Sequence, residues 1–173
     1  MKRMIVLGML SAIVLWFGSS CSTTSVVTQE GKTAFDMAVQ SLKDGSFVLE
    51  GSFIQFRRGT MTSVSPTTNF ISLEDGTATV QLVGNNMGSN SIGGITLEGR
   101  ASDIQLQTDR KGNVTYRMSV MGTILTATIQ IDIPYGTNRA TATVYPTFNS
   151  NRLLLTGDLY PIELAKVFKG RAL

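Results

Sequence analysis

The spacing of hydrophobic residues divides the chain into three parts. Residues 4–17 form an uninterrupted apolar run. Within residues 30–44, four apolar side chains fall at i, i+3, i+4 and i+7, which places them on one side of an α-helix: Phe35, Ala38, Val39 and Leu42. Gly45 stands where a helix C-cap belongs. From residue 47 onward apolar and polar residues alternate, as in β-strands, so we expect one helix that covers an open face or mouth of a β-structure.

The first half of the β-region predicts three strands. The first begins at Phe47 and ends at Arg57-Arg58-Gly59. Alternation divides its large side chains between two faces, with Phe47, Leu49 and Phe53 on one and Val48, Ile54 and Phe56 on the other. Residues 60–68 are rich in Thr, Ser and Pro and predict a loop. Strands over 70–73 and 78–83 follow, joined through Asp75-Gly76, a dipeptide favoured in hairpin turns.

Residues 95–159 predict an antiparallel meander. A long strand over 96–107 changes phase near Ser102-Asp103, which indicates a β-bulge. The clearest alternation lies in 123–133, where one face carries Leu125, Ala127, Ile129, Ile131 and Ile133. Pro161 fits the first position of a short C-terminal helical turn. In total we expect a mainly β fold in which an antiparallel meander of about eight strands forms a curled sheet, a barrel or a two-layer sandwich.

The N-terminal segment indicates export. Lys2 and Arg3 precede the apolar run of fourteen residues, which has the length of a signal-peptide hydrophobic region and is short for a membrane-spanning helix. The stretch Gly18-Ser19-Ser20-Cys21 resembles the lipobox of Gram-negative lipoproteins, in which the cysteine receives the lipid. We expect a signal peptide over 1–20, a lipidated Cys21 with a tether over 21–29, and a single β-rich domain over 30–173.

The residues after Cys21 also indicate where in the cell envelope the protein is localised. The first acidic residue after Cys21 is Glu30, so the acidic cluster that marks some surface-exposed lipoproteins is missing, and no Asp follows Cys21 directly, as inner-membrane retention would favour. We expect an exported protein that is anchored to the outer membrane through Cys21 and faces the periplasm.

Composition excludes several chemistries. Without Lys2 and Arg3, the fifteen basic residues fall to thirteen against twelve acidic residues, a net charge of +1, and the basic residues are scattered, which argues against nucleic-acid binding. The chain has no histidine, and lipid would consume the sole cysteine. His-dependent nucleophiles, His or Cys metal sites and disulfides are therefore removed. We expect no enzymatic activity, no metal and no cofactor.

Residues 84–94 form the candidate binding loop. The segment is rich in Gly, Asn and Ser, and its bare backbone could approach a ligand. The candidate ligand-binding residues are Asn85, Asn86, Met87 and Asn90. The segment lacks the Gly-Lys-Ser/Thr ending of a phosphate loop. The alternative is a wide connection that needs positive φ at several positions.

Two further functions depend on particular side chains. Met87, Met118 and Met121 could line an adaptable pocket for a small apolar ligand, in a barrel or under the helix, or could simply fill gaps in the core. A carboxylate-only hydrolase would draw on acidic residues within the predicted strands, namely Glu98, Asp103, Asp132 and Asp158. It requires two of them roughly 5–10 Å apart in a cleft, and the alternative is solvated charge on a sheet.

Several short motifs, in order, resemble an uncharacterised lipoprotein family, domain of unknown function 4251. They are Asn69-Phe70-Ile71, Val80-Gln81-Leu82, the run from Gly93 to Gly99 and the run from Leu155 to Pro161. The resemblance covers roughly residues 30–170 and implies a secreted or lipid-anchored single domain, with no known activity or substrate. We therefore expect a non-catalytic binding or structural module whose partners are the membrane, through Cys21, and an envelope protein or glycan.

Overall fold

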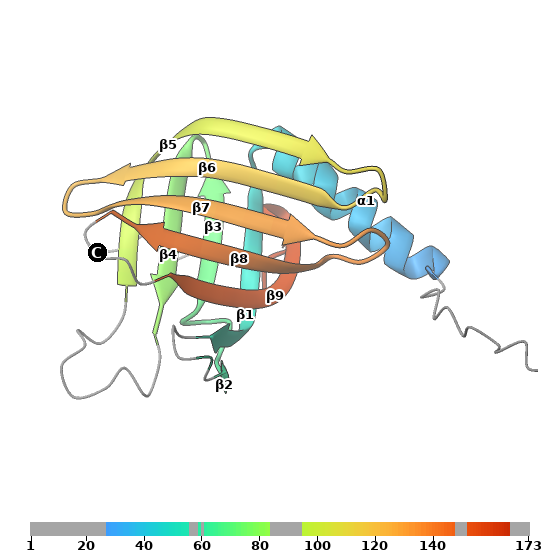
Figure 1. The fold of residues 1–173 in the computed structure, drawn as a ribbon, viewed down its shortest axis with the longest axis horizontal. Helices are drawn as coiled ribbons and strands as arrows, with labels where there is room; N and C mark the ends of the chain where they lie inside the picture. The colour runs from blue at the N-terminus through green and yellow to red at the C-terminus, as the bar shows by residue number, and fades with distance from the viewer. Residues whose placement is uncertain (1–26, 56–58, 60, 84–94, 148–151, 167–173) are drawn as a thin grey trace, which may run out of the picture.

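A computed structural model of the protein describes residues 27–55, 59, 61–83, 95–147 and 152–166 (Figure 1). Within these residues the chain forms one α-helix, nine β-strands and one 3-10 helix. In chain order they are α1 (Gln29–Asp44), β1 (Phe47–Gln55), β2 (Met61–Ser63), β3 (Phe70–Glu74), β4 (Thr77–Leu82), β5 (Ile95–Thr108), β6 (Val114–Gly122), β7 (Thr126–Ile133), β8 (Arg139–Pro146), β9 (Leu153–Pro161) and η1 (Ile162–Leu164).

The sheet closes on itself through β1. Each strand from β3 to β9 pairs antiparallel with the next, and β1 pairs with β3 along one edge and with β9 along the other. The short strand β2 pairs with the end of β1, beyond β3. The described strands therefore form an eight-stranded antiparallel barrel with one extra strand. Of the three predicted arrangements, the structure is therefore the barrel. Closure pairs the backbone N–H and C=O groups that would be exposed at the edges of an open sheet.

The barrel interior is filled by its own side chains. Alternate residues of each strand point inward and form one hydrophobic core with α1. The largest fully buried side chains are Tyr116, Phe47, Leu42, Leu49, Ile54, Ile71, Leu73, Leu82, Met118, Ile129, Ile131 and Ile133. This agrees with the capacity of eight strands, which leave an interior just wide enough for side chains. The inward face predicted for 127–133 is confirmed.

In β1 the prediction of two continuous faces is wrong. Gly51 pairs with Gly157 but Phe53 pairs with Thr156, so β1 contains one extra residue at this point. A bulge of one residue exchanges the two faces of the strand that follows. Ile54 therefore joins Phe47 in the barrel core, whereas Phe53 lies outside it, beside the Arg139 guanidinium.

Two local backbone predictions are confirmed. Asp75 and Gly76 join β3 to β4 with φ angles of 50° and 74°, the left-handed conformation that a type I′ hairpin needs at both positions. In β5, Ser102 pairs with Ser119 and Gln105 with Arg117, which leaves one extra residue between them. Asp103 takes φ 51° in this bulge.

Three element boundaries differ from prediction. Met61–Ser63 is a strand within the predicted loop, because these residues find an unoccupied stretch of the β1 edge. β7 begins at Thr126 rather than 123, and Ile124 is fully exposed in the turn before it. Pro161 ends β9 and caps η1 instead of occupying its first helical position.

Helix α1 covers one end of the barrel. Its predicted bounds hold to one residue: Thr28 caps the start by accepting a hydrogen bond from the Gly31 amide at 3.0 Å, and Gly45 ends it with φ 66°. Phe35, Ala38 and Leu42 enter the barrel core. The Phe35 ring meets the ring of Tyr135, a residue of the β7–β8 turn, edge to face at 5.2 Å.

The chain after β9 folds over the outside of β1. Ile162 packs against Val48 in a second, small hydrophobic cluster with Phe70, Tyr160 and Ala165. The backbone amide of Lys166 donates a hydrogen bond to the Glu50 carboxylate, which is 6% exposed. This cover explains how β1 buries side chains on both of its faces.

Candidate functional site

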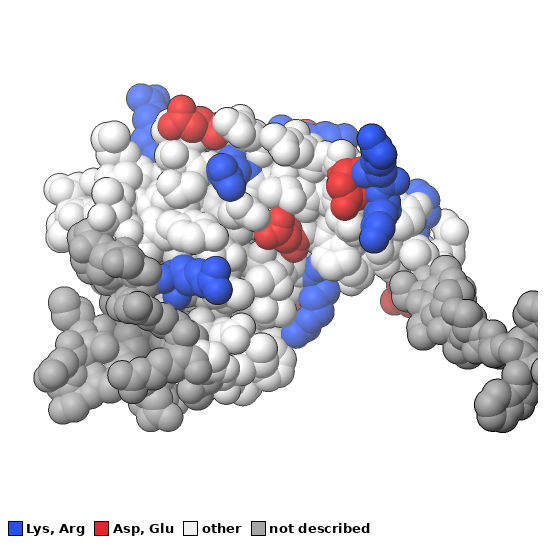
Figure 2. Space-filling view, in the orientation of Figure 1, with Lys and Arg blue, Asp and Glu red and all other residues white. Residues whose placement is uncertain are grey.

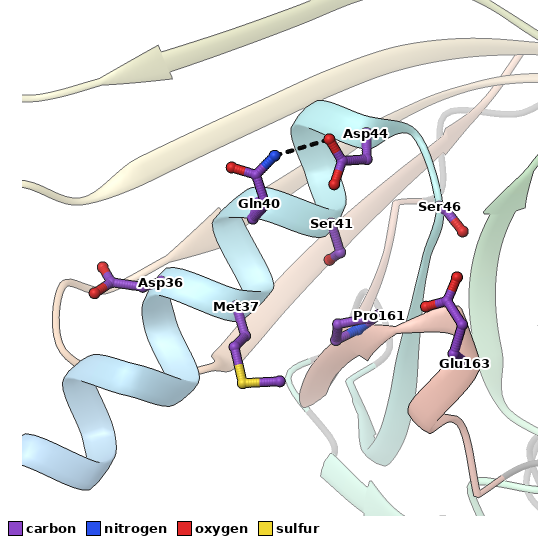
Figure 3. Close-up of a pocket in the computed structure, with 8 residues that line it drawn as sticks. All are labelled: Asp36, Met37, Gln40, Ser41, Asp44, Ser46, Pro161 and Glu163. Atoms are coloured by element: carbon purple, nitrogen blue, oxygen red, sulfur yellow. Dashed lines mark hydrogen bonds between the residues drawn. The ribbon is translucent and has the colours of Figure 1, made fainter.

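A groove lies between α1 and the end of β9. It encloses about 380 Å³ and is lined by Asp36, Met37, Gln40, Ser41, Asp44, Ser46, Pro161 and Glu163 (Figure 3). One wall is a face of α1, since residues three or four positions apart lie on the same side of a helix. The opposite wall is the junction of β9 and η1. Segments more than a hundred residues apart in the chain thus meet at this groove.

The walls of the groove are held by contacts of the barrel itself. Pro161 pairs with Phe47 at the start of β1, and the Ile162 amide donates to the Ser46 carbonyl at 3.4 Å. On α1, the Ser41 hydroxyl is buried and donates to the Ala38 carbonyl at 2.8 Å, so it is satisfied within the helix. The groove is therefore shaped by the sheet and the helix and does not depend on a bound group.

Carboxylates surround the groove. Asp36 accepts a salt bridge from Lys32 at 2.7 Å, and Asp44 accepts a hydrogen bond from the Gln40 amide at 2.8 Å. The salt bridges formed within the described residues are Lys32–Asp36 and Arg139–Asp158, so neither Asp44 nor Glu163 has a basic partner there. A groove lined by two carboxylates that have no basic partner in the described part of the chain favours a positively charged group on its ligand.

The groove also offers an apolar contact. Met37 is 43% exposed, although it lies on the side of α1 that faces the barrel junction, and it reaches toward Pro161 in Figure 3. Methionine adapts its shape to varied partners because its side chain is unbranched and polarizable. The combination of a thioether with carboxylates suits a ligand that carries both an apolar stem and a cation, such as lysine or arginine.

The four carboxylates predicted for a hydrolase are not brought together with one another. Glu98 pairs with Thr79, and Asp103 lies exposed in the β5 bulge. Asp132 accepts hydrogen bonds from Thr115 at 2.7 Å and from Gln130 at 3.0 Å. Asp158 bonds to Arg139 at 3.5 Å. Asp103, Asp132 and Asp158 bond to polar neighbours, and Glu98 is exposed.

A different acidic pair was missed at the sequence level. Glu50 on β1 stands directly opposite Asp158 on β9, and the segment around Lys166 covers it. The alternation pattern of this strand was interpreted from its large apolar side chains, and it left Glu50 unassigned. A charged residue between Leu49 and Gly51, within the apolar run, was the available signal. The groove residues of α1 were also missed, because the polar side of an amphipathic helix ordinarily faces water.

The methionine pocket is not formed as predicted. Met118 points into the core and is fully buried, whereas Met121 lies on the outer side of the same strand and is 68% exposed. Odd and even positions of one strand face opposite sides of the sheet, so these two cannot line a common pocket. Met87 lies outside the described residues, as do Asn85, Asn86 and Asn90 of the candidate loop and the lipid-attachment residue Cys21.

The described residues show a mixed surface charge, no metal-binding cluster and no membrane-spanning helix. Both signs of charge are interspersed over the face shown in Figure 2. The described part of the chain contains no group of three or more acidic, cysteine or histidine side chains placed to hold a metal ion. It also contains no helix with the length and hydropathy required to cross a membrane.

Comparison with known proteins places this barrel in a family. The model of a domain of unknown function, DUF4251, matches residues 29–159, from the start of α1 into β9. The chain belongs to the DUF4251 family. The structure is also similar to the crystal structure of a DUF4251 family protein from Bacteroides eggerthii, with 40% sequence identity and a TM-score of 0.74. The match covers 82% of this chain and 97% of that chain. No curated protein matches the chain.

Membership of DUF4251 confirms the resemblance seen in the sequence motifs. The matched segment contains β1 to β8, most of β9 and the α1 wall of the groove, but it ends before Pro161 and Glu163. The crystal structure of the relative therefore corresponds to this barrel. The groove combines α1, which lies inside the matched segment, with η1, which follows it.

Proposed function

We propose that this DUF4251 protein is a non-catalytic binding module, anchored in the cell envelope by lipid on Cys21, that holds a basic segment of another envelope protein in the groove between α1 and η1. The observation that carries the proposal is the groove itself. Its wall residues Asp44 and Glu163 have no basic partner among the described residues, and Met37 is left exposed beside them.

A filled barrel directs binding to the outside. The inward positions are occupied by aliphatic and aromatic side chains that pack with α1 into one core, and a packed core leaves its ligand surface on the exterior. The side chains that line the groove carry carboxylates, hydroxyls, an amide and a thioether. None of these lining groups is an imidazole or a thiol, the usual partners of an activated nucleophile, so we assign the groove to binding rather than to catalysis.

The groove is tested by reversing its charge. Asp44→Lys with Glu163→Lys should abolish capture of an envelope partner, which is cross-linked from a photoreactive residue at Met37 and identified by mass spectrometry. Glu74→Lys with Glu98→Lys makes the same change in net charge on exposed strand positions and should leave capture intact. Equal capture by both variants would contradict binding of the partner in the groove. If the unmodified protein instead sediments with purified cell-wall glycan and the groove variant does not, the partner is a glycan rather than a protein.

The anchor is tested separately. The precursor should incorporate fatty acid and be cleaved before Cys21, whereas the Cys21→Ala precursor should remain uncleaved and unlabelled. Normal processing of that variant would overturn the lipoprotein assignment. Native mass spectrometry of residues 21–173 distinguishes the module from a carrier, because a carrier would release a bound small molecule on denaturation.

A further inference from the structure

The N-terminal end of α1 is joined to two turns of the barrel. Val27, the first described residue, lies against Gly136 so closely that a Cβ there would strike the Val27 side chain. Tyr135, the neighbour of Gly136, lies over Gly112: the position of a Cβ on Gly112 would be 2.9 Å from the Tyr135 ring. The entry to α1, the β7–β8 turn and the β5–β6 turn therefore form one continuous surface.

This surface is close to the proposed lipid by covalent geometry alone. Six residue steps separate Cys21 from Val27, and a chain reaches at most about 3.3–3.6 Å per residue. Val27 therefore lies within roughly 20 Å of the lipid, and the β7–β8 turn is in contact with Val27 through Gly136. The other end of the barrel is farther away, because the rise from Arg139 to Tyr145 along β8 adds about 20 Å.

The chemistry of this end suits an anionic membrane surface. Arg110 and Lys111 are exposed at the tip of the β5–β6 turn, and Figure 2 shows blue Lys and Arg side chains at that end of the molecule, beside red acidic ones. Tyr135 is 42% exposed beside them. Basic side chains are attracted to anionic headgroups, and tyrosine favours the membrane–water interface.

Two of the acidic groups at this end are held by local contacts. The Asp109 carboxylate turns back into its own turn and accepts hydrogen bonds from the Lys111 and Asn113 amides at 2.8 and 2.9 Å. Asp36 is paired with Lys32. Glu30 is exposed in the first turn of α1, and both Glu30 and Asp109 keep a negative charge that opposes the attraction.

We propose that Arg110, Lys111 and Tyr135 form a membrane-proximal surface that rests on anionic phospholipid when the chain is anchored at Cys21. The inference builds on the anchor in the proposed function and adds an orientation: the barrel stands with the turns beside α1 toward the lipid and its opposite end away from it. The groove between α1 and η1 then has a fixed position relative to the membrane.

The sole cysteine permits a test with the chain from Cys21 to Leu173, coupled through Cys21 to maleimide lipid in vesicles that contain phosphatidylglycerol. The chain's single Trp, Trp16, precedes Cys21, so Tyr135→Trp and Tyr145→Trp each supply a unique reporter. Their parent side chains are 42% and 43% exposed, at opposite ends of the barrel. Brominated lipid should quench Trp fluorescence in the Tyr135→Trp variant and leave the Tyr145→Trp variant unquenched. Quenching of the second variant alone, or of neither, would overturn the proposal.

Charge reversal tests the basic residues. Arg110→Glu with Lys111→Glu should remove the quenching of the Tyr135→Trp reporter, because each basic residue near an anionic surface contributes about five-fold to association. Arg100→Glu with Arg152→Glu changes the net charge equally at exposed positions away from the two turns and should preserve it. Equal quenching of the Tyr135→Trp reporter on neutral vesicles would show that charge attraction does not hold this surface against the membrane. Because coupling supplies the anchor chemically, these results do not depend on whether cells lipidate Cys21.

Discussion

Gly51 on β1 and Gly157 on β9 face each other across the seam that closes the barrel, and the Gly157 backbone lies in contact with the Glu50 carbonyl. A Cβ at Gly157 would strike that carbonyl oxygen and stand 2.9 Å from the Gly51 Cα. The β1 bulge begins at the same place. Close approach of two glycines thus allows β1 to bend while it remains paired with β9.

Gly157→Ala should therefore destabilise the closed barrel. The added methyl group meets backbone, which cannot rotate away, and we expect a loss of roughly 1–3 kcal/mol in the free energy of unfolding. Urea denaturation followed by circular dichroism measures the change. Ser119→Ala, a small substitution on β6 away from the seam, serves as the matched control. Equal stability of the two variants would show that the seam tolerates a side chain.

Asn69 is the buried polar group that ties β3 to the end of β4. Its side-chain oxygen accepts a hydrogen bond from the Val83 amide at 2.6 Å, and its amide donates to the Ser65 carbonyl at 3.1 Å. Asn69→Ala leaves both backbone groups without this partner and should cost roughly 1–3 kcal/mol. Thermal unfolding should show a larger loss for Asn69→Asp, which keeps the acceptor for Val83 but places a buried carboxylate against the Ser65 carbonyl. A smaller loss for Asn69→Asp than for Asn69→Ala would show that the bond with Val83 outweighs the contact with Ser65.

Tyr116 carries a hydroxyl that has no hydrogen-bond partner within the described structure. Its ring packs edge to face on Phe47 at 5.4 Å inside the core. Tyr116→Phe keeps the ring and removes the unsatisfied group, so we expect stability at pH 7 to be unchanged or higher by about 1 kcal/mol. A loss of stability, measured by urea denaturation, would show that the hydroxyl is engaged.

The same substitution should remove an alkaline transition. Burial raises the pKa of Tyr116 to about 12, above the ordinary value of 10.0. The folded protein therefore holds this proton more tightly than the unfolded chain, and its contribution to stability is complete below pH 10 and lost as the pH rises toward 12. The difference in stability between the two proteins should shift toward Tyr116→Phe by about 1.4 kcal/mol per pH unit in that window. If the free energies of unfolding of the two proteins change in parallel between pH 10 and pH 12, Tyr116 does not have a raised pKa.

Phe35 attaches α1 to the barrel. It is 6% exposed and contacts the Tyr135 ring. Phe35→Ala should cost about 3–5 kcal/mol, because it leaves a cavity between helix and barrel. Hydrogen exchange should accelerate first in α1, and Met37→Ala on an exposed position of the same helix provides the control. Equal protection of α1 in both variants would mean that other contacts hold the helix.

Local patterns were sufficient where a structure depends on neighbouring residues. The helix over 29–44 follows from its own apolar stripe and from caps at Thr28 and Gly45. The Asp75-Gly76 hairpin follows from two residues that accept positive φ. Alternation identified the inward face of β7, because period two requires no knowledge of the partner strand. Each of these predictions rests on interactions within a few positions of the chain.

Pairing between distant segments decided what those patterns left open. The face occupied by Ile54 depends on a bulge opposite Gly157, and closure of the barrel depends on the contact of β1 with β9. The groove unites Asp44 with Glu163, which no sequence spacing relates. The sequence by itself determined the mainly β class, the helix and the motifs of the DUF4251 family. The tertiary structure alone decided closure, the phase of β1 and the position of the groove, because those depend on which distant backbones come into hydrogen-bonding contact.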